Sequence, residues 1–269
     1  MASSECNQQL VVVNQSKGVA RILLNDPAKK NALSKEMINE LLCVLDRVAV
    51  NDKLRLMVLR GADGMFCAGA DLHWMKAGVT QSDEDNRKDA HLFYQLFEKL
   101  NAYPKPVIVW VEKYAMGGAL GLLACADYVI AEKTVKMAFS EVRLGLVPAT
   151  IAPFVINKIG LSQARALLLT GEVFSAKKAK RIGLIHEVLE AKEIPQRINR
   201  LCEQLSANSP SAMKNTKELL NTLSKHGKEN EDKLLCIDKI AQARTSDEGQ
   251  EGVRAFFEKR NPQWHPQKQ

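Results

Sequence analysis

The feature that most constrains this chain is a pair of glycine-containing turns, each placed after an apolar run typical of a β-strand. One turn is Tyr114–Gly121, after the run 107–111, and the other is Phe66–Leu72, after the run 56–60. A strand that turns into a helix through glycines leaves backbone N–H groups pointing at open space, where an anion or a developing oxyanion is stabilised. Glycines that only supply backbone freedom are the alternative. The second turn of the same type favours a binding site.

Strand-type and helix-type segments alternate along most of the chain. The runs 10–14 and 19–24 predict a hairpin, and the apolar spacing over 34–50 predicts a helix with Ser34 as its N-cap. A second helix is expected over about 88–101, after a mobile polar stretch at 78–88. The alternation predicts an α/β fold with mixed strands and helices.

The character of the chain changes near residue 194. Beyond this point the pattern predicts only helices, over 194–207, 210–224 and 229–245, and from Glu248 onward. We therefore expect a core over residues 1–199 and a helical region over residues 200–269.

Composition and missing motifs exclude several function classes. The six cysteines and five histidines show no ligand spacing, and neither nucleotide-binding glycine motifs nor metallohydrolase or serine-hydrolase motifs occur. The net charge of +7 is ordinary for a soluble domain, and no basic block with aromatic residues indicates nucleic-acid binding. No apolar run approaches the roughly 20 residues that span a bilayer. We expect a cytoplasmic protein without metal, separate cofactor, nucleic acid or membrane as partner.

The remaining chemistry is a site with two backbone donors and one carboxylate. The donors would be the N–H groups of Ala70 and Gly118, and the carboxylate would be Glu141, which lies in a largely apolar stretch. Burial there would raise the pKa of Glu141 and suit a general acid or base. The alternative is a structural or exposed glutamate, paired for example with Arg143.

Seven motifs in order resemble the crotonase, or enoyl-CoA hydratase/isomerase, superfamily over nearly the whole chain. They are Leu24–Pro27 with Lys30–Leu33, Phe66–Leu72, Gly117–Gly118, Glu141–Pro148, Leu169–Glu172, Ile182–Ile185, and Glu251–Gly252 with Arg260. The resemblance implies a spiral of strand-strand-helix repeats and a helical C-terminal region that forms homotrimers or hexamers built as dimers of trimers.

The same resemblance implies an acyl-CoA substrate, so that coenzyme A enters as part of the substrate. The thioester oxygen would lie between the N–H groups of Ala70 and Gly118, with Gly117 beside them, and Gly118 is expected to allow close approach of the substrate and to need glycine torsions. The positions implied to contact the CoA moiety are Lys30, Ala32, Ala68, Asp71, Leu72, His73, Phe256 and Lys259.

One position departs from the pattern of the family. Two-glutamate hydratases carry their first catalytic glutamate where this chain has Gly121, so only Glu141 is retained. A single acid suits isomerisation, in which one group moves a proton from the α- to the γ-carbon. It also allows hydration if one water supplies both hydroxyl and proton, and we expect glycine at 121 to leave space for that water.

A finer resemblance favours hydration. The segments 117–122, 140–146, 208–210 and 248–252 are similar to a bacterial subgroup of methylglutaconyl-CoA or γ-carboxygeranoyl-CoA hydratases, which serve leucine and acyclic-terpene breakdown. We therefore expect an enoyl-CoA hydratase acting on a branched, carboxylated acyl-CoA. Isomerase activity and a catalytically silent acyl-CoA-binding protein are the alternatives. The candidates to anchor a substrate carboxylate are His73, Lys76, Lys113 and Arg143.

Overall fold

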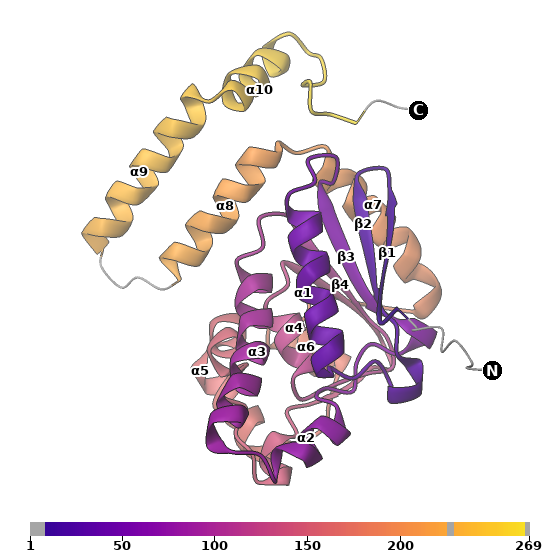
Figure 1. Ribbon diagram of the computed structural model, residues 1–269. Helices are drawn as coiled ribbons and strands as arrows, with labels where there is room; N and C mark the ends of the chain where they lie inside the picture. The colour runs from indigo at the N-terminus through magenta and orange to yellow at the C-terminus, as the bar shows by residue number, and fades with distance from the viewer. Residues whose placement is uncertain (1–8, 225–228, 267–269) are drawn as a thin grey trace, which may run out of the picture.

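A six-stranded sheet forms the centre of the molecule (Figure 1). The computed structural model describes residues 9–224 and 229–266, so that Cys6, His226 and the polar start of the chain lie outside the described residues. The first two strands pair antiparallel as a hairpin, as predicted, and the other neighbours pair parallel. In spatial order the strands are β1 (Val11–Ser16), β2 (Val19–Leu24), β3 (Leu56–Gly61), β4 (Val107–Val111), β6 (Tyr128–Glu132) and β9 (Glu187–Leu189).

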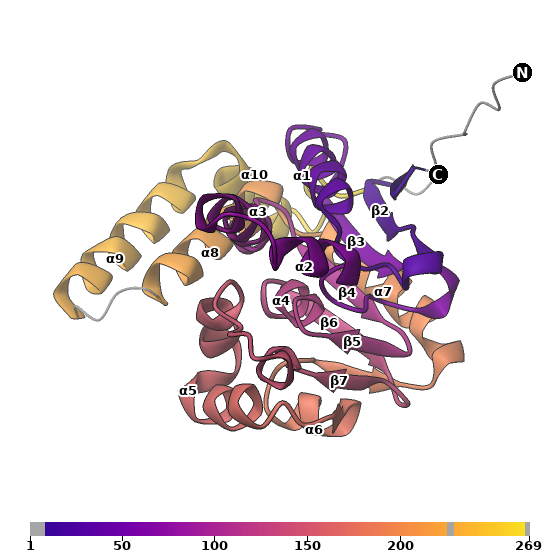
Figure 2. The same cartoon turned by 60° about the horizontal axis from the view of Figure 1, so that its bottom comes forward.

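Helices cover both faces of this sheet (Figures 1 and 2). On one face lie α1 (Lys35–Ala49) and α3 (Asp83–Asn101), which bury apolar stripes in the main core. On the other face lies α7 (Ile194–Ser206), whose Ile194 and Ile198 pack against strand residues such as Val58. The predicted α/β architecture is therefore confirmed.

Helix caps explain where the two long helices begin. The hydroxyl of Ser34 accepts a hydrogen bond from the N–H of Met37 at 3.1 Å, which confirms the predicted cap of α1. The hydroxyl of Ser82 does the same for Asp85, and three acidic residues occupy the first turn of α3. Because of this cap α3 begins at residue 83, so the prediction of a mobile stretch over 78–88 was wrong for its second half.

A second, three-stranded sheet lies beside the first and was not predicted. It consists of β5 (Tyr114–Met116), β7 (Lys136–Ala138) and β8 (Phe174–Ser175). The chain passes from β4 to β5 through Lys113, which has a left-handed backbone with φ of 58°. The glycine turn at 117–118 thus follows β5 of the small sheet, not β4 of the large one.

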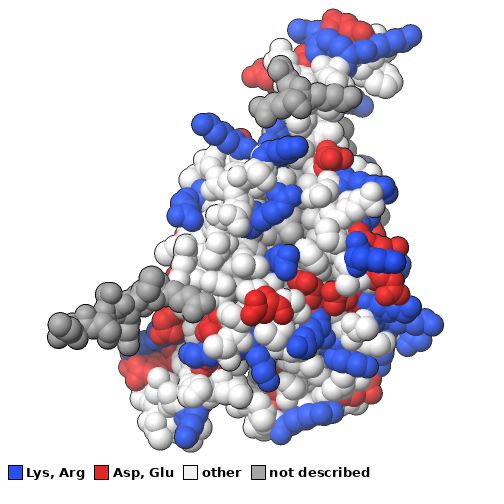
Figure 3. All heavy atoms as spheres, turned by 90° about the vertical axis from the view of Figure 1, so that its right-hand side faces the viewer, with Lys and Arg blue, Asp and Glu red and all other residues white. Residues whose placement is uncertain are grey.

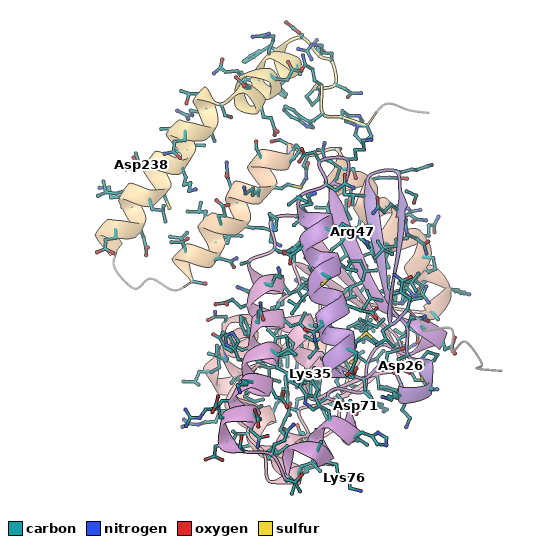
Figure 4. All side chains as sticks on the ribbon, viewed as in Figure 1. Asp26, Lys35, Arg47, Asp71, Lys76 and Asp238 are labelled. Atoms are coloured by element: carbon teal, nitrogen blue, oxygen red, sulfur yellow. The ribbon has the colours of Figure 1, made fainter. Side chains whose placement is uncertain are left out.

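Short elements connect these layers. The helices are α2 (Leu72–Gly78), α4 (Ala119–Ala124), α5 (Ala152–Thr170) and α6 (Ala176–Arg181), and the 3-10 turns are η1 (Pro27–Lys29), η2 (Ala62–Gly64), η3 (Glu141–Leu144) and η4 (Ala191–Glu193). Helix α4 is fully buried, whereas α2 lies at the end of the molecule where Asp71 and Lys76 are marked (Figure 4).

The last three helices form an arm, of which α9 projects farthest from the body in both ribbon views (Figures 1 and 2). They are α8 (Pro210–Leu223), α9 (Glu229–Thr245) and α10 (Asp247–Phe257). Residue 200 lies inside α7, which packs on the sheet, so the arm itself begins with α8. The division of the chain at residues 199 and 200 stays a prediction.

Charges of both signs are interspersed on the face shown in Figure 3. Within the described residues, no helix is long and apolar enough to cross a membrane.

Candidate active site

Three chain segments converge at the ends of neighbouring strands. Strands β5 and β7 run parallel, with Met116 opposite Ala138, so the residues that follow each strand emerge side by side. The N–H of Gly117 donates to the carbonyl of Ala138 at 2.9 Å and joins these two ends. A parallel bridge between Cys67 and Ala115 brings the turn 66–72 to the other side of β5. The two glycine turns and Glu141 therefore meet, as predicted from the sequence.

The two predicted donors lie on adjoining turns and have no acceptors among the described residues. A Cβ atom placed on Gly69 would lie 3.6 Å from the nitrogen of Gly118, so the two turns are in contact. The N–H of Leu33 donates to the carbonyl of Gly69, and the carbonyl of Leu33 accepts from the N–H of Asp71. The N–H of Ala70, which lies between these two residues, takes no part in this pairing. Within the described residues neither Ala70 nor Gly118 donates its N–H to a protein acceptor. Two free donors on adjoining turns suit an oxyanion.

The carboxylate of Glu141 lies against the turn at Gly117. Its Oε1 is 3.2 Å from the point where a Cβ atom on Gly117 would lie. Its Oε2 is buried and has no hydrogen-bond partner in the described part of the chain. Burial raises the pKa of the Glu141 carboxyl, and the hydrogen bond from its own backbone N–H offsets this rise only partly. A carboxylate with a raised pKa and one buried oxygen that lacks a hydrogen-bond partner is suited to proton transfer.

Two glycines give the turns their shape. Gly69 has φ of 92°, and a Cβ atom there would lie 2.5 Å from the carbonyl oxygen of Met116. Gly117 has φ of 50° and turns the chain toward α4. Gly118 has an ordinary helical backbone with φ of −52°, so the expectation that it needs glycine torsions was wrong. A Cβ atom on Gly118 would meet Leu33 and Phe93 at 3.8 Å, which is ordinary contact.

The space beside Gly121 is filled, which corrects a second expectation. A Cβ atom on Gly121 would lie 2.5 Å from Cγ2 of Ile151, and 2.7 and 2.9 Å from ring atoms of Phe97. Both side chains are almost fully buried. Glycine at 121 therefore leaves room neither for a carboxylate nor for a water at that position, because the side chains of Ile151, the N-cap of α5, and Phe97 of α3 occupy it.

Most of the residues predicted to contact CoA lie together. The N–H of Ala68 donates to the carbonyl of Lys30 at 3.1 Å, so the segment 30–32 borders the turn 66–72. Ala32 is buried, whereas Lys30, Leu72 and His73 are exposed. The structure thus brings these positions to one edge of the site.

Asp71 links the donor turn to α2. It is almost fully buried, caps α2 by accepting the N–H of Trp74 at 2.9 Å, and forms an ion pair with Lys29 at 3.4 Å. Burial alone would raise the pKa of Asp71, but these hydrogen bonds and the nearby lysine outweigh it and hold the pKa below its usual range. Asp71 therefore acts as an ionised cap that fixes the residue directly after Ala70.

Phe256 and Lys259 are not near Glu141 within one chain. Phe256 is exposed on α10, which lies at the opposite end of the molecule from α2 (Figure 1). In Figure 4 the labelled residue Asp238 on α9 and the labelled residue Asp71 likewise lie toward opposite ends of the molecule. A contact of Phe256 or Lys259 with CoA would require a second copy of the chain.

The four candidate anchors for a substrate carboxylate are all exposed. They are His73, whose side chain is 88% exposed at 3.8 Å from Asp71, and Lys76, Lys113 and Arg143. In the described part of the chain, no group of three His, Cys, Asp or Glu side chains could hold a metal ion.

Sequence reasoning missed several residues that shape the site. Asn31 is fully buried, accepts the N–H of Asp26, and donates to the carbonyls of Ala62 and Met65. It adopts φ of 54°, a conformation in which asparagine is enriched, and this was the available signal. Phe93 and Phe97 have helical i, i+4 spacing, which indicates a buried face but not what that face contacts.

Comparison with known proteins agrees with this geometry. A family model described as enoyl-CoA hydratase/isomerase matches residues 14–267. A putative enoyl-CoA hydratase of Thermus thermophilus is 34% identical over 94% of this chain and 100% of its own length. The 2,3-dehydroadipyl-CoA hydratase of Escherichia coli is 29% identical, with 94% of this chain and 97% of that protein covered. The crystal structure of an enoyl-CoA hydratase from Shewanella pealeana superposes with a TM-score of 0.92 at 36% identity and covers 96% of this chain and 97% of that one.

Proposed function

The chain belongs to the enoyl-CoA hydratase/isomerase family of enzymes and has its crotonase-like fold, and from this premise we propose that it hydrates a 2-enoyl-CoA with Glu141 as its only acid–base group. The observation that carries the proposal is the buried Oε2 of Glu141, which lacks a hydrogen-bond partner among the described residues, on a carboxylate that lies at the turn whose next residue carries one of the two free backbone N–H groups. The thioester oxygen would bind between the N–H groups of Ala70 and Gly118, which stabilise the enolate by roughly 3–4 kcal/mol each.

A single water can complete this reaction. Glu141 in its ionised form accepts a proton from the water as the hydroxyl adds to the β-carbon, and it then returns that proton to the α-carbon. Because Phe97 and Ile151 fill the space beside Gly121, the water has to approach from the side of Gly117, where the carboxylate lies.

Isomerisation is the second candidate because the same packing leaves only one acid. Glu141 could remove a proton from the α-carbon and return it to the γ-carbon without any water. The apolar contacts of Phe97 and Ile151 with the position of Gly121 favour this candidate specifically, since they exclude a second carboxylate there.

We propose further that the acyl group is branched and carboxylated. The motif resemblance to hydratases of carboxylated acyl-CoAs supports this, as does the name of the Escherichia coli relative, whose dehydroadipyl substrate carries a carboxylate at the far end. The exposed side chains of His73, Lys76, Lys113 and Arg143 are the candidate anchors.

Isotope incorporation separates these functions. In oxygen-18 water, 3-methylglutaconyl-CoA should gain one labelled oxygen, and crotonyl-CoA should react more slowly. Conversion of a 3-enoyl thioester to its 2-enoyl isomer without label would establish the isomerase instead. Acyl-CoA binding without turnover of either type would identify a silent binding protein and refute the proposal.

We also propose that the arm mediates assembly into a homotrimer or a hexamer. Its helices expose large apolar side chains, among them Leu220 on α8 and Leu234, Ile237 and Ile240 on α9, each at least half exposed. Apolar residues that no element of the same chain covers are typical of an interface.

A further inference from the structure

Two stacked aromatic side chains connect the two donor turns. The rings of Trp74 on α2 and Phe93 on α3 lie with centroids 4.9 Å apart and planes inclined by 15°. Trp74 is joined to one donor turn, because its N–H is bound by Asp71, the residue after Ala70. Phe93 is joined to the other, because its ring lies 3.8 Å from the point where a Cβ atom on Gly118 would be.

This ring pair is held rigidly but is not covered. The indole N–H of Trp74 donates to Asp89 at 2.6 Å, and Asp89 in turn pairs with Lys35 at 3.3 Å. Behind the pair, Phe97 packs on Phe93 with a centroid distance of 6.5 Å and is fully buried. Trp74 and Phe93 themselves remain partly exposed. Fixed aromatic faces that stay open beside a site supply a ready apolar surface for a ligand at low entropic cost.

We propose that Trp74 and Phe93 are specificity-determining residues that bind the apolar part of the acyl group, so that the preferred substrates are 2-enoyl thioesters with an extended alkyl or aryl substituent beyond the double bond. This inference rests on the proposed function, because it takes the thioester oxygen to lie between Ala70 and Gly118. The two rings, each joined to one of the donor turns, are then within reach of the acyl group bound at that oxygen.

Turnover of a graded series of thioesters tests the proposal. The specificity constant kcat/KM should be higher for 2-octenoyl-CoA and cinnamoyl-CoA than for crotonyl-CoA. In the Trp74→Ala variant this preference should fall by about tenfold, the scale set by lost apolar contacts in a specificity pocket. The value for crotonyl-CoA, which has little to place on the rings, should change by less than threefold.

Matched variants separate ring contact from structural damage. Tyr94→Ala removes an aromatic side chain from the same helix, at a position that packs on Phe154 and not on Trp74. It should leave the preference unchanged. Trp74→Phe keeps an aromatic ring but loses the hydrogen bond to Asp89, and it should retain most of the preference. Phe93→Leu should lower the preference as Trp74→Ala does.

A binding measurement distinguishes failure of this inference from failure of the proposed function. Calorimetric binding of the saturated analogues octanoyl-CoA and butanoyl-CoA needs no turnover. Octanoyl-CoA should bind the wild type more tightly than butanoyl-CoA, and Trp74→Ala should reduce that ratio. An unchanged ratio in a folded Trp74→Ala variant, or an equal loss in Tyr94→Ala, overturns the role of the rings even if Glu141 proves catalytic.

Discussion

Adding one methyl group at Gly121 tests the packing that leaves this site a single acid. In Gly121→Ala the new Cβ atom would lie 2.5 Å from Ile151 and 2.7 and 2.9 Å from Phe97, whereas ordinary contacts are 3.4–4 Å. Neither neighbour can move into solvent, because both are almost fully buried. The matched control is Gly118→Ala on the same turn, where the nearest contacts are 3.8 Å.

The expected magnitude follows from two opposing effects. Alanine in place of glycine stabilises a helix by up to about 1 kcal/mol. Overpacking a filled core costs about 1–3 kcal/mol. The overpacking cost lies near the upper end of this range, because the new atom would press on two buried side chains. The helix gain offsets part of it at Gly121, which lies inside α4, but not at Gly118, which is the N-cap of α4. We therefore expect Gly121→Ala to be less stable than Gly118→Ala by about 2 kcal/mol, which corresponds to roughly 4–8 °C in melting temperature for a chain of this size.

Thermal unfolding followed by circular dichroism, with both variants at one protein concentration, gives this difference directly. Equal melting temperatures, or a higher one for Gly121→Ala, would refute the packing. In that event Gly121 would have space beside it, and a water or a carboxylate could be placed there after all.

Three further predictions concern charge, capping and assembly. Because burial raises the pKa of Glu141, its neutral form is favoured in the folded state. The stability associated with that form is present below the unfolded pKa and is lost as the pH rises through the folded pKa. Glu141→Gln should therefore gain stability over the wild type as the pH rises above the unfolded pKa, measured by urea unfolding at each pH. Asp71→Ala should cost about 1 kcal/mol through loss of the α2 cap, with urea unfolding as the measurement, and no loss would contradict its role as a cap. Leu234→Glu with Ile237→Glu should shift the mass by light scattering from a multiple of three chains toward a monomer, and a wild type that is monomeric at micromolar concentration would exclude the proposed assembly.

The convergence of the two glycine turns with Glu141 could be predicted from the sequence. Turn glycines after strand-type runs are local signals, and the order of motifs around them supplied the long-range pairing. The cap at Ser34 and the hairpin predicted from the runs 10–14 and 19–24 are local in the same sense and are confirmed. The roles of the donors and of Glu141 in catalysis stay predictions.

The surroundings of the glycines could not be predicted. The space beside Gly121 depends on Phe97 and Ile151, which are distant from it in sequence. The apolar pattern around these two residues predicts only that they belong to a core. Strands β5 and β7 have three residues each, too few for an alternating pattern to emerge. The helical torsions of Gly118 and the left-handed ones of Gly117 likewise depend on how these short strands meet.

Single-turnover kinetics of Glu141→Gln, with acyl-CoA binding measured in parallel, test the central claim most directly. The substitution keeps the shape of the side chain and removes its ability to accept a proton. The rate of the chemical step should fall by roughly 10²–10⁴, the scale of general acid–base catalysis, while the dissociation constant for a saturated acyl-CoA stays within about threefold of the wild type. A variant that retains the wild-type rate would contradict the account, because Glu141, whose buried Oε2 has no hydrogen-bond partner in the described part of the chain, would then not be the group that transfers the proton.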